Sequence, residues 1–391
     1  MSRTWNQYVV KQENKALVLT TIINHTPISR AAVAQSTGLN KGTVSSLVSE
    51  LIDEAFVTES GPGASSGGRR PVMLLFNAKA GFTVSVDLGV GYIQAALTDL
   101  NGEIVQVEKK QVKESTFDLV FETLVHLIEQ LIKHAPVSRY GVIGIGVGVP
   151  AVVSHEGEIL LAPNLNWKNI QLKQALEDVF DLPILIENEA NAGAYGEMRF
   201  GFKQPPKDMI YASIGIGIGA GMILDGKLYT GKSGFSGEIG HMTIVKDGTS
   251  CRCGNVGCFE RYASEQVLLE HAVKRHLIKA NEDLSLDTLI KKAEAHDQEV
   301  LQLFEEVGEY IGIGLTNIIN IFNPEVVLIG NRLRDLQKWL IPPIEHYIHS
   351  RAIGFHQQDL TVDFAKLENF STVKGMAAFT IERFLAQLKD I

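Results

Sequence analysis

The sequence is poor in cysteine and in long apolar runs. It contains three cysteines in 391 residues, too few for the disulfide framework on which small secreted domains depend. No uninterrupted apolar run approaches the ~18–20 residues that a membrane span requires, and residues 1–11 are polar and mixed, unlike a secretory signal. We therefore expect a cytoplasmic protein with no membrane partner. Its length favours two or three domains, each with its own core.

The net charge of −9 is distributed unevenly along the chain. Residues 1–80 carry eight Lys or Arg against five Asp or Glu, a net charge of +3, which leaves −12 for residues 81–391. A mildly basic head on an acidic body is typical of a DNA-binding module joined to a domain that binds another ligand.

The basic N-terminal segment carries the signals of three helices, expected over residues 14–24, 30–36 and 41–54. Ser29 and Asn40 are suitable N-caps for the second and third helices, because their short side chains can accept hydrogen bonds from the first free backbone N–H groups. The turn between these two helices is only a few residues long. The sequence therefore predicts a helix-turn-helix.

The third helix has one apolar stripe for packing, which leaves one lysine and several small hydroxylic residues on its outer faces. Such residues allow a helix to enter the major groove and to bond phosphates and base edges. The expected DNA-binding residues of the two helices and their caps are Ser29, Arg30, Asn40, Lys41, Thr43, Ser45 and Ser46.

Two short apolar segments over residues 56–59 and 72–76 flank a Gly/Ser-rich turn over residues 61–68. We interpret them as the strands of a wing. Arg69 and Arg70 at its tip are placed to reach a phosphate or the minor groove. The alternative interpretation is a helical cap followed by a flexible linker.

From residue 82 onwards the pattern changes to apolar runs that end in glycine, as over residues 82–89, 142–148 and 210–217. Helical segments such as 117–134 and 172–180 alternate with them. Strands that alternate with helices indicate an α/β body whose glycine-lined turns face a cleft.

Four motifs of this body resemble those of the Repressor/ORF/Kinase (ROK) family, which has the actin-like sugar-kinase fold. They are an Asp-x-Gly strand end at 87–89 and the segments 187–197, 237–241 and 251–260. The resemblance extends over residues 80–391.

With the N-terminal helices and the segment 65–71 included, the whole chain resembles the xylose-responsive repressors of that family. The resemblance implies a winged helix-turn-helix over residues 1–78, followed by a two-lobed actin-like (sugar kinase/ROK) ATPase-type fold of the α/β class. The N-terminal lobe is expected over 79–188, completed by a C-terminal helix over 375–391. The C-terminal lobe is expected over 189–374 and to carry a zinc knuckle.

Several positions depart from the kinase pattern of the family. Gly91 and the loop 215–217 lack the threonines of the two phosphate loops, and segment 330–332 has Asn-Arg where kinases have small glycines. Phosphate loops work through backbone and hydroxyl donors. The base is changed as well, because Glu189 follows Asn188 where kinases have aspartate, and its carboxylate lies one methylene further out. We therefore expect ligand binding without catalysis, so the protein is not expected to be an enzyme.

All three cysteines, Cys251, Cys253 and Cys258, lie within eight residues of one another, shortly after His241. Three thiolates and one imidazole are a normal tetrahedral set for structural Zn²⁺. The alternative is a chance cluster of buried thiols.

The resemblance also implies a sugar site. Carboxylates and amides suit vicinal diols, because each makes two directional hydrogen bonds. The residues of this chain that match the family's sugar contacts are Asn188, Glu189, Glu238, His241 and Glu260, together with Asn164, for which a loop-capping role is an equal alternative.

The resemblance as a whole implies a repressor of xylose-utilisation genes. It would bind a palindromic operator as a homodimer and be released by a sugar effector, D-xylose. Two alternatives are a ROK sugar kinase with an added DNA-binding head, and a ROK repressor controlled by a sugar-transporter protein that docks near the zinc region.

Overall fold

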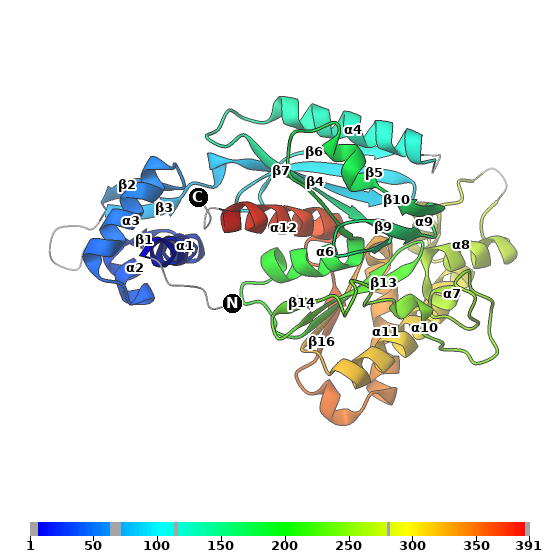
Figure 1. Ribbon diagram of the computed structural model, residues 1–391. Helices are drawn as coiled ribbons and strands as arrows, with labels where there is room; N and C mark the ends of the chain where they lie inside the picture. The colour runs from blue at the N-terminus through cyan, green and yellow to red at the C-terminus, as the bar shows by residue number, and fades with distance from the viewer. Residues whose placement is uncertain (1–6, 63–71, 113–115, 280–281, 388–391) are drawn as a thin grey trace.

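The computed structural model describes residues 7–62, 72–112, 116–279 and 282–387. A small N-terminal head stands at one end of a larger body made of two lobes (Figure 1). None of the helices in these described ranges is long and apolar enough to cross a membrane.

The head contains three helices and a three-stranded sheet of order β1-β3-β2, the arrangement of a winged helix-turn-helix. Its elements are α1 (Gln7–His25), β1 (Ile28–Ser29), α2 (Arg30–Thr37), α3 (Lys41–Asp53), β2 (Val57–Pro62) and β3 (Val72–Phe76).

Both expected helix caps of the head are present. Ser29 Oγ accepts a hydrogen bond from the backbone N–H of Ala32 at 3.2 Å, and Asn40 Oδ1 accepts one from that of Thr43 at 2.8 Å.

Helix α1 begins seven residues earlier than expected, and an ion pair at 2.9 Å between Lys11 and Glu50 of α3 holds its first half in place.

The N-terminal lobe is built on a five-stranded sheet of order β11-β7-β4-β5-β6. Strands β4, β5 and β6 form an antiparallel meander, whereas β7 and β11 run parallel to β4. Helix α4 covers one face of this sheet. The elements are a 3₁₀ turn (Ala78–Ala80), β4 (Phe82–Gly89), β5 (Tyr92–Asp99), β6 (Ile104–Gln111), α4 (Phe117–His134), β7 (Val142–Val149) and β11 (Ile184–Asn188).

A small antiparallel sheet lies between β7 and β11 in the chain. It consists of β8 (Val152–Val153), β9 (Ile159–Ala162) and β10 (Trp167–Ile170), followed by α5 (Leu172–Glu177). Helix α5 is three residues shorter than the sequence pattern suggests, because the chain turns after Glu177.

The C-terminal lobe repeats the same strand pattern in its five-stranded sheet, of order β14-β13-β12-β15-β16. Apolar residues of α10 pack against this sheet. The elements are α6 (Glu189–Gly196), a π turn (Glu197–Gly201), β12 (Met209–Ile214), β13 (Ile218–Leu224), β14 (Lys227–Tyr229), a 3₁₀ turn (Ile239–His241), α7 (Glu260–Ala263), α8 (Glu265–Lys274), α9 (Leu286–Glu294), α10 (Gln298–Phe322), β15 (Val326–Gly330), a 3₁₀ turn (Arg332–Leu336), α11 (Gln337–Arg351), two 3₁₀ turns (Gly354–Gln357 and Glu368–Phe370) and β16 (Thr361–Phe364).

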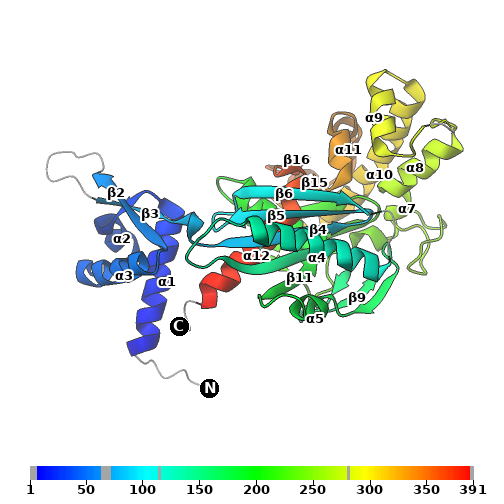
Figure 2. The same cartoon turned by 90° about the horizontal axis from the view of Figure 1, so that it is seen from above.

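Two helices lie between the lobes. Helix α6 packs on β12 and β13 of the C-terminal lobe, α12 (Ser371–Gln387) packs on β4 and β7 of the N-terminal lobe, and the two helices pack on each other. Figure 2 shows α12 running from the lobes toward the head. The paired, similarly wound sheets with helices between them confirm the actin-like fold expected from the sequence. Helix α12 begins four residues earlier than expected, at Ser371 rather than at residue 375.

Candidate functional site: a polar cavity beside a metal-ligand cluster

A cavity of about 390 Å³ lies where the N-terminal end of α6 meets the small sheet and the loops of the C-terminal lobe. Its volume is within the range of small-molecule sites. The structure brings together all six residues expected to bind sugar in the lining of this cavity: Asn164, Asn188, Glu189, Glu238, His241 and Glu260.

Asn188 is fixed by the backbone around it. As the N-cap of α6, its Oδ1 accepts hydrogen bonds from the backbone N–H groups of Ala190 at 2.8 Å and Asn191 at 3.1 Å. Its Nδ2 donates to the carbonyl of Ala151 at 2.9 Å. The second N–H of this amide remains for a ligand, because a primary amide carries two.

Glu189, at the start of α6, is held by neighbours and is not positioned as a free base. Its Oε1 accepts from the hydroxyl of Ser213 at 3.1 Å and from the Nδ2 of Asn331 at 3.4 Å. Burial, together with the charge of Asp87, raises the pKa of Glu189 to about 8. A carboxyl group with such a pKa is largely protonated at neutral pH, so it is a poor acceptor for a sugar proton.

Asp87 lies close to Glu189 and is buried as well. Burial raises the pKa of Asp87 to about 6, and the hydroxyl of Tyr92 donates to its Oδ2 at 2.8 Å. Because the charge of Asp87 adds to the burial that raises the pKa of Glu189, a second negative charge is disfavoured at this point.

The two loops that correspond to the kinase phosphate loops leave little space between them. The cavity that Gly89, Ile216 and Gly217 line together with Asn331 and Arg332 has a volume of about 60 Å³. A ligand of nucleotide size needs several times this volume. Ile216, Asn331 and Arg332, at positions where the sequence departs from the kinase pattern, line this small cavity.

The neighbouring cavity, of about 230 Å³, has more acidic than basic residues in its lining. Its charged lining residues are Lys109 and Arg332 against Asp87, Asp287, Asp335 and Glu368. Four acidic side chains against two basic ones offer little attraction to the phosphates of a nucleotide.

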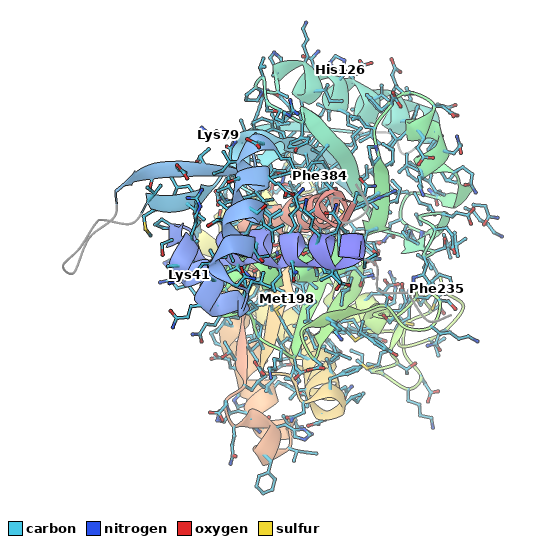
Figure 3. The ribbon with its side chains drawn as sticks, turned by 60° about the vertical axis from the view of Figure 1, so that its left-hand side comes forward. Lys41, Lys79, His126, Met198, Phe235 and Phe384 are labelled. Atoms are coloured by element: carbon cyan, nitrogen blue, oxygen red, sulfur yellow. The ribbon has the colours of Figure 1, made fainter. Side chains whose placement is uncertain are left out.

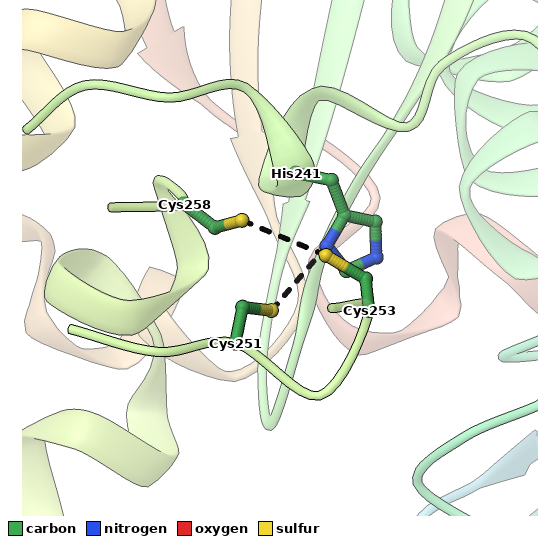
Figure 4. A group of neighbouring side chains, drawn as sticks. All are labelled: His241, Cys251, Cys253 and Cys258. Carbon is green, nitrogen blue, oxygen red and sulfur yellow. Dashed lines mark hydrogen bonds between the residues drawn. The ribbon is translucent and has the colours of Figure 1, made fainter. Parts of the chain in front are cut away.

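The three thiols and the imidazole expected to bind zinc converge at one point. The ligand atoms of His241, Cys251, Cys253 and Cys258 all lie within 4.8 Å of one another (Figure 4). The Sγ atoms of Cys253 and Cys258 are 3.7 Å apart, and Cys251 Sγ is 3.7 Å from His241 Nδ1. Tetrahedral coordination with Zn–S bonds of ~2.3 Å places two sulfur atoms about 3.8 Å apart. The cluster therefore fits a tetrahedral metal ion.

A glycine permits the tight fold of this knuckle. Gly257 has φ +72°, and a Cβ atom there would stand 1.7 Å from the carbonyl oxygen of Val245. Only glycine fits such a position, since it has neither the steric restriction on φ nor the side chain.

The metal-ligand cluster and the cavity share a wall. His241 Nδ1 faces the cluster, whereas its Nε2 lies 3.8 Å from Glu238 Oε2 on the cavity side. Burial raises the pKa of Glu238. His241 can therefore ligate a metal through one nitrogen and orient toward the cavity with the other.

Sequence reasoning missed several residues of the cavity lining, of which Arg252 and Leu161 differ in the signal they offered. Arg252 lies between two of the cysteines and Leu161 lies on β9, and both line the cavity. The position of Arg252 between two metal-ligand candidates could have indicated that it lies near the cavity. For Leu161, nothing in the sequence distinguishes it from a leucine of the core.

On the head, the structure places the expected DNA-binding residues in two groups. Lys41, Ser45 and Ser46 are exposed on α3, and Thr43 is half-buried beside them. Figure 3 shows Lys41 on the outer surface of the head.

The remaining head residues make intramolecular contacts. Ser29 and Asn40 use their side-chain oxygens as helix caps, and the guanidinium of Arg30 pairs with Glu59 of β2 at 2.6 Å. Arg69 and Arg70 lie outside the described residues.

Comparison with known proteins agrees with this geometry. The model of the ROK family matches residues 83–383, so the chain belongs to the ROK family. It is 42% identical over 380 residues to the xylose repressor of Bacillus subtilis (strain 168), covering 97% of this chain and 98% of that repressor.

Two solved structures are also similar. One is a ROK family transcriptional regulator, homolog of the E. coli MLC protein, with a TM-score of 0.81 and 29% identity, covering 98% of this chain and all of the other. The second is a ROK family glucokinase from Streptomyces griseus in complex with glucose and AMPPNP, with a TM-score of 0.69 and 28% identity, covering 76% of this chain and 98% of the kinase. The similarity to the regulator includes the head.

Proposed function

We propose that this protein represses xylose-utilisation genes by binding operator DNA, and that D-xylose in the cavity releases it. The observation that carries the proposal is that one polar cavity is lined by all six matching sugar residues, while the cavity at Ile216 and Arg332 measures only about 60 Å³. Similarity to a xylose repressor over almost the full length of both chains supports the choice of sugar and the DNA-binding role.

In this proposal the head binds DNA with α3 in the major groove, through Lys41, Thr43, Ser45 and Ser46. Arg69 and Arg70 of the wing would contact phosphate or the minor groove. Two copies of the chain would read two half-sites of a palindrome, spaced by about one helical turn of ~34 Å or a multiple of it.

Sugar binding would use the groups that the cavity presents. Asn188 has one N–H free, and Glu238 and Glu260 offer carboxylate oxygens to neighbouring hydroxyls of the sugar, with Asn164 and Glu189 as further polar partners. A ligand that contacts both lobes favours the closed arrangement of the lobes, and only such a difference in affinity can shift the equilibrium.

We further propose that the cluster of His241, Cys251, Cys253 and Cys258 holds one structural Zn²⁺. Zinc has no catalytic role here. When bound, it would fix the knuckle, so that Glu260 and the Nε2 of His241 keep their places in the cavity wall.

A binding experiment tests the proposal. The affinity of the purified chain for promoter DNA upstream of xylose-utilisation genes would be measured by fluorescence anisotropy with and without millimolar D-xylose, and xylose binding by calorimetry. We expect xylose to bind and to weaken DNA binding. Sugar binding without any change in DNA affinity would contradict release, and no sugar binding at all would favour control by a transporter protein.

The kinase alternative has one observation in its favour, the similarity of the body to a glucokinase. A coupled assay with ATP and either xylose or glucose separates the two. We expect no turnover, and a rate near the ~1–100 s⁻¹ of ordinary kinases would establish the kinase.

A further inference from the structure

Helix α12 contacts both the helix that begins at the sugar cavity and the core of the head. We propose that α12 transmits sugar binding from the cavity to the DNA-binding head. This inference rests on the proposed function and adds the route through which the two sites are coupled.

At the cavity end, the first half of α12 is locked against α6. The hydroxyl of Thr372 donates to the backbone carbonyl of Glu189 at 3.3 Å. A Cβ atom on Gly375 would stand 1.7 Å from the carbonyl oxygen of Ala192, so the two helix backbones touch at this point. Close-packed helices do not slide freely past each other. A displacement of α6 by a bound sugar therefore displaces α12.

A buried carboxylate ties the same two helices together at their other contact. Glu197, directly after α6, is 0% exposed. It accepts a hydrogen bond from the hydroxyl of Ser371 at 2.7 Å and others from the backbone N–H groups of Leu367 and Lys366 at 2.9 and 3.0 Å. The first turn of α12 is thus held by the end of α6 as well as by its beginning.

At the opposite end, α12 completes the core of the head. Ala377 and Ile381 are buried in the same apolar cluster as the helices of the head. The ring of Phe384 lies 5.2 Å from that of Tyr140 and 6.1 Å from that of Phe56, measured between centroids. Figure 3 shows Phe384 at the end of α12 that meets the head.

One hydrogen bond continues this contact to the end of the recognition helix. The hydroxyl of Tyr140 donates to the backbone carbonyl of Glu54 at 2.9 Å, and Glu54 is the residue that directly follows α3. The chain of contacts therefore runs from Glu189 through α6 and α12 to the aromatic group of Phe384, Tyr140 and Phe56, and then to α3. A rigid element that both sites contact can couple them, provided that the two sites favour different positions of it.

The test uses the full-length protein with Phe384→Ala, and with Gln387→Ala as the matched control, since Gln387 is exposed on the same last turn. Xylose affinity is measured by calorimetry. Operator affinity is measured with and without saturating xylose, and the ratio of the two operator affinities is the coupling.

For Phe384→Ala we expect xylose affinity within about twofold of wild type and a coupling reduced at least about fivefold, whereas Gln387→Ala keeps both. A variant that binds operator and retains the full coupling overturns the proposal. If xylose does not change the operator affinity of the wild-type protein, the proposed function is wrong. The role of α12, which rests on it, is then wrong as well.

Because Phe384→Ala also removes core contacts, two further measurements avoid that change. Tyr140→Phe keeps the ring and removes only the hydroxyl, which bonds Glu54 and interacts with Arg139, so we expect it to reduce the coupling with a melting temperature close to that of wild type. In the wild-type protein, xylose should alter amide hydrogen exchange over residues 382–387 and 54–57. If xylose changes amide hydrogen exchange at residues 188–191 but at neither 382–387 nor 54–57, the proposed role of α12 is wrong.

Discussion

The Sγ of Cys251 lies 3.0 Å from the Oε1 of Glu260, so the metal-ligand cluster and the cavity proposed to bind sugar are in direct contact. In the absence of a metal this contact is a hydrogen bond from the thiol to the carboxylate. When the thiol is a deprotonated metal ligand, it can no longer donate, and the carboxylate is free to turn toward a ligand in the cavity. The state of the cluster therefore bears on the sugar site.

The first prediction follows from this contact. Replacing Cys253 by Ser should remove the bound metal and weaken xylose binding. Because Cys253 itself lines the cavity, Cys258→Ser, at a ligand outside that lining, should have the same two effects. Elemental analysis and calorimetry measure the two effects, with Val256→Ala in the same loop as the control. Native protein without zinc, or a metal-free variant with normal xylose affinity, would contradict the prediction.

A second prediction concerns the carboxylates of the cavity. Glu238→Gln and Glu260→Gln should each weaken xylose binding by roughly 10- to 150-fold, because a hydrogen bond to a charged group contributes about 1.5–3 kcal/mol. Calorimetry measures the change, and Glu177→Gln on the exposed side of α5 is the control. If both variants bind xylose as tightly as wild type, another cavity holds the sugar.

The third prediction is a pH dependence of stability. The folded chain keeps protons on Glu189, with a pKa of about 8, and on Asp87, with a pKa of about 6, whereas the unfolded chain releases them near their ordinary values of 4.5 and 3.8. These two groups thus bind more protons in the folded state between about pH 4 and pH 8, and their contribution to stability falls as the pH rises through this window.

Glu189→Gln removes most of this loss, because an amide cannot ionise and can still accept from Ser213. We expect the variant to melt at a higher temperature than wild type at pH 8 and to differ little from it at pH 5. Melting curves by circular dichroism measure the difference. Tyr92, Arg332 and Asn331 surround the same carboxyl groups and are unchanged in the variant. Equal effects at both pH values would show that Glu189 is ionised in the folded protein.

The last prediction concerns DNA. Lys41→Ala, Arg69→Ala and Arg70→Ala should each weaken operator binding, and each lost phosphate contact should make the slope of log K against log salt about 0.9 less steep. Anisotropy titrations at several salt concentrations measure the slope. Lys232→Ala, on an exposed loop of the C-terminal lobe, should leave it unchanged. A uniform loss of affinity with the wild-type slope would mean that these residues do not contact phosphates.

Much of the fold and of the site could be predicted because the signals are local. Ser29 and Asn40 cap the helices that follow them, and a cap needs only the next three residues. Cys251, Cys253 and Cys258 lie within one loop, so their spacing alone predicts a shared ligand. The residues proposed to bind sugar were named differently, through resemblance of their motifs to a family, because Asn164 and Glu260 lie far apart in the sequence.

By itself, the sequence determined the order of the elements, the helix-turn-helix, the cysteine cluster and the loss of the kinase residues. Only the tertiary structure decided that Arg30 pairs with Glu59, that Arg252 lines the cavity, and that Phe384 packs with Phe56 and Tyr140 at the junction of head and body. The physical reason is sequence separation. Burial of an aromatic ring depends on which distant surfaces meet, and the spacing of apolar residues within α12 reveals that a face is buried without revealing against what.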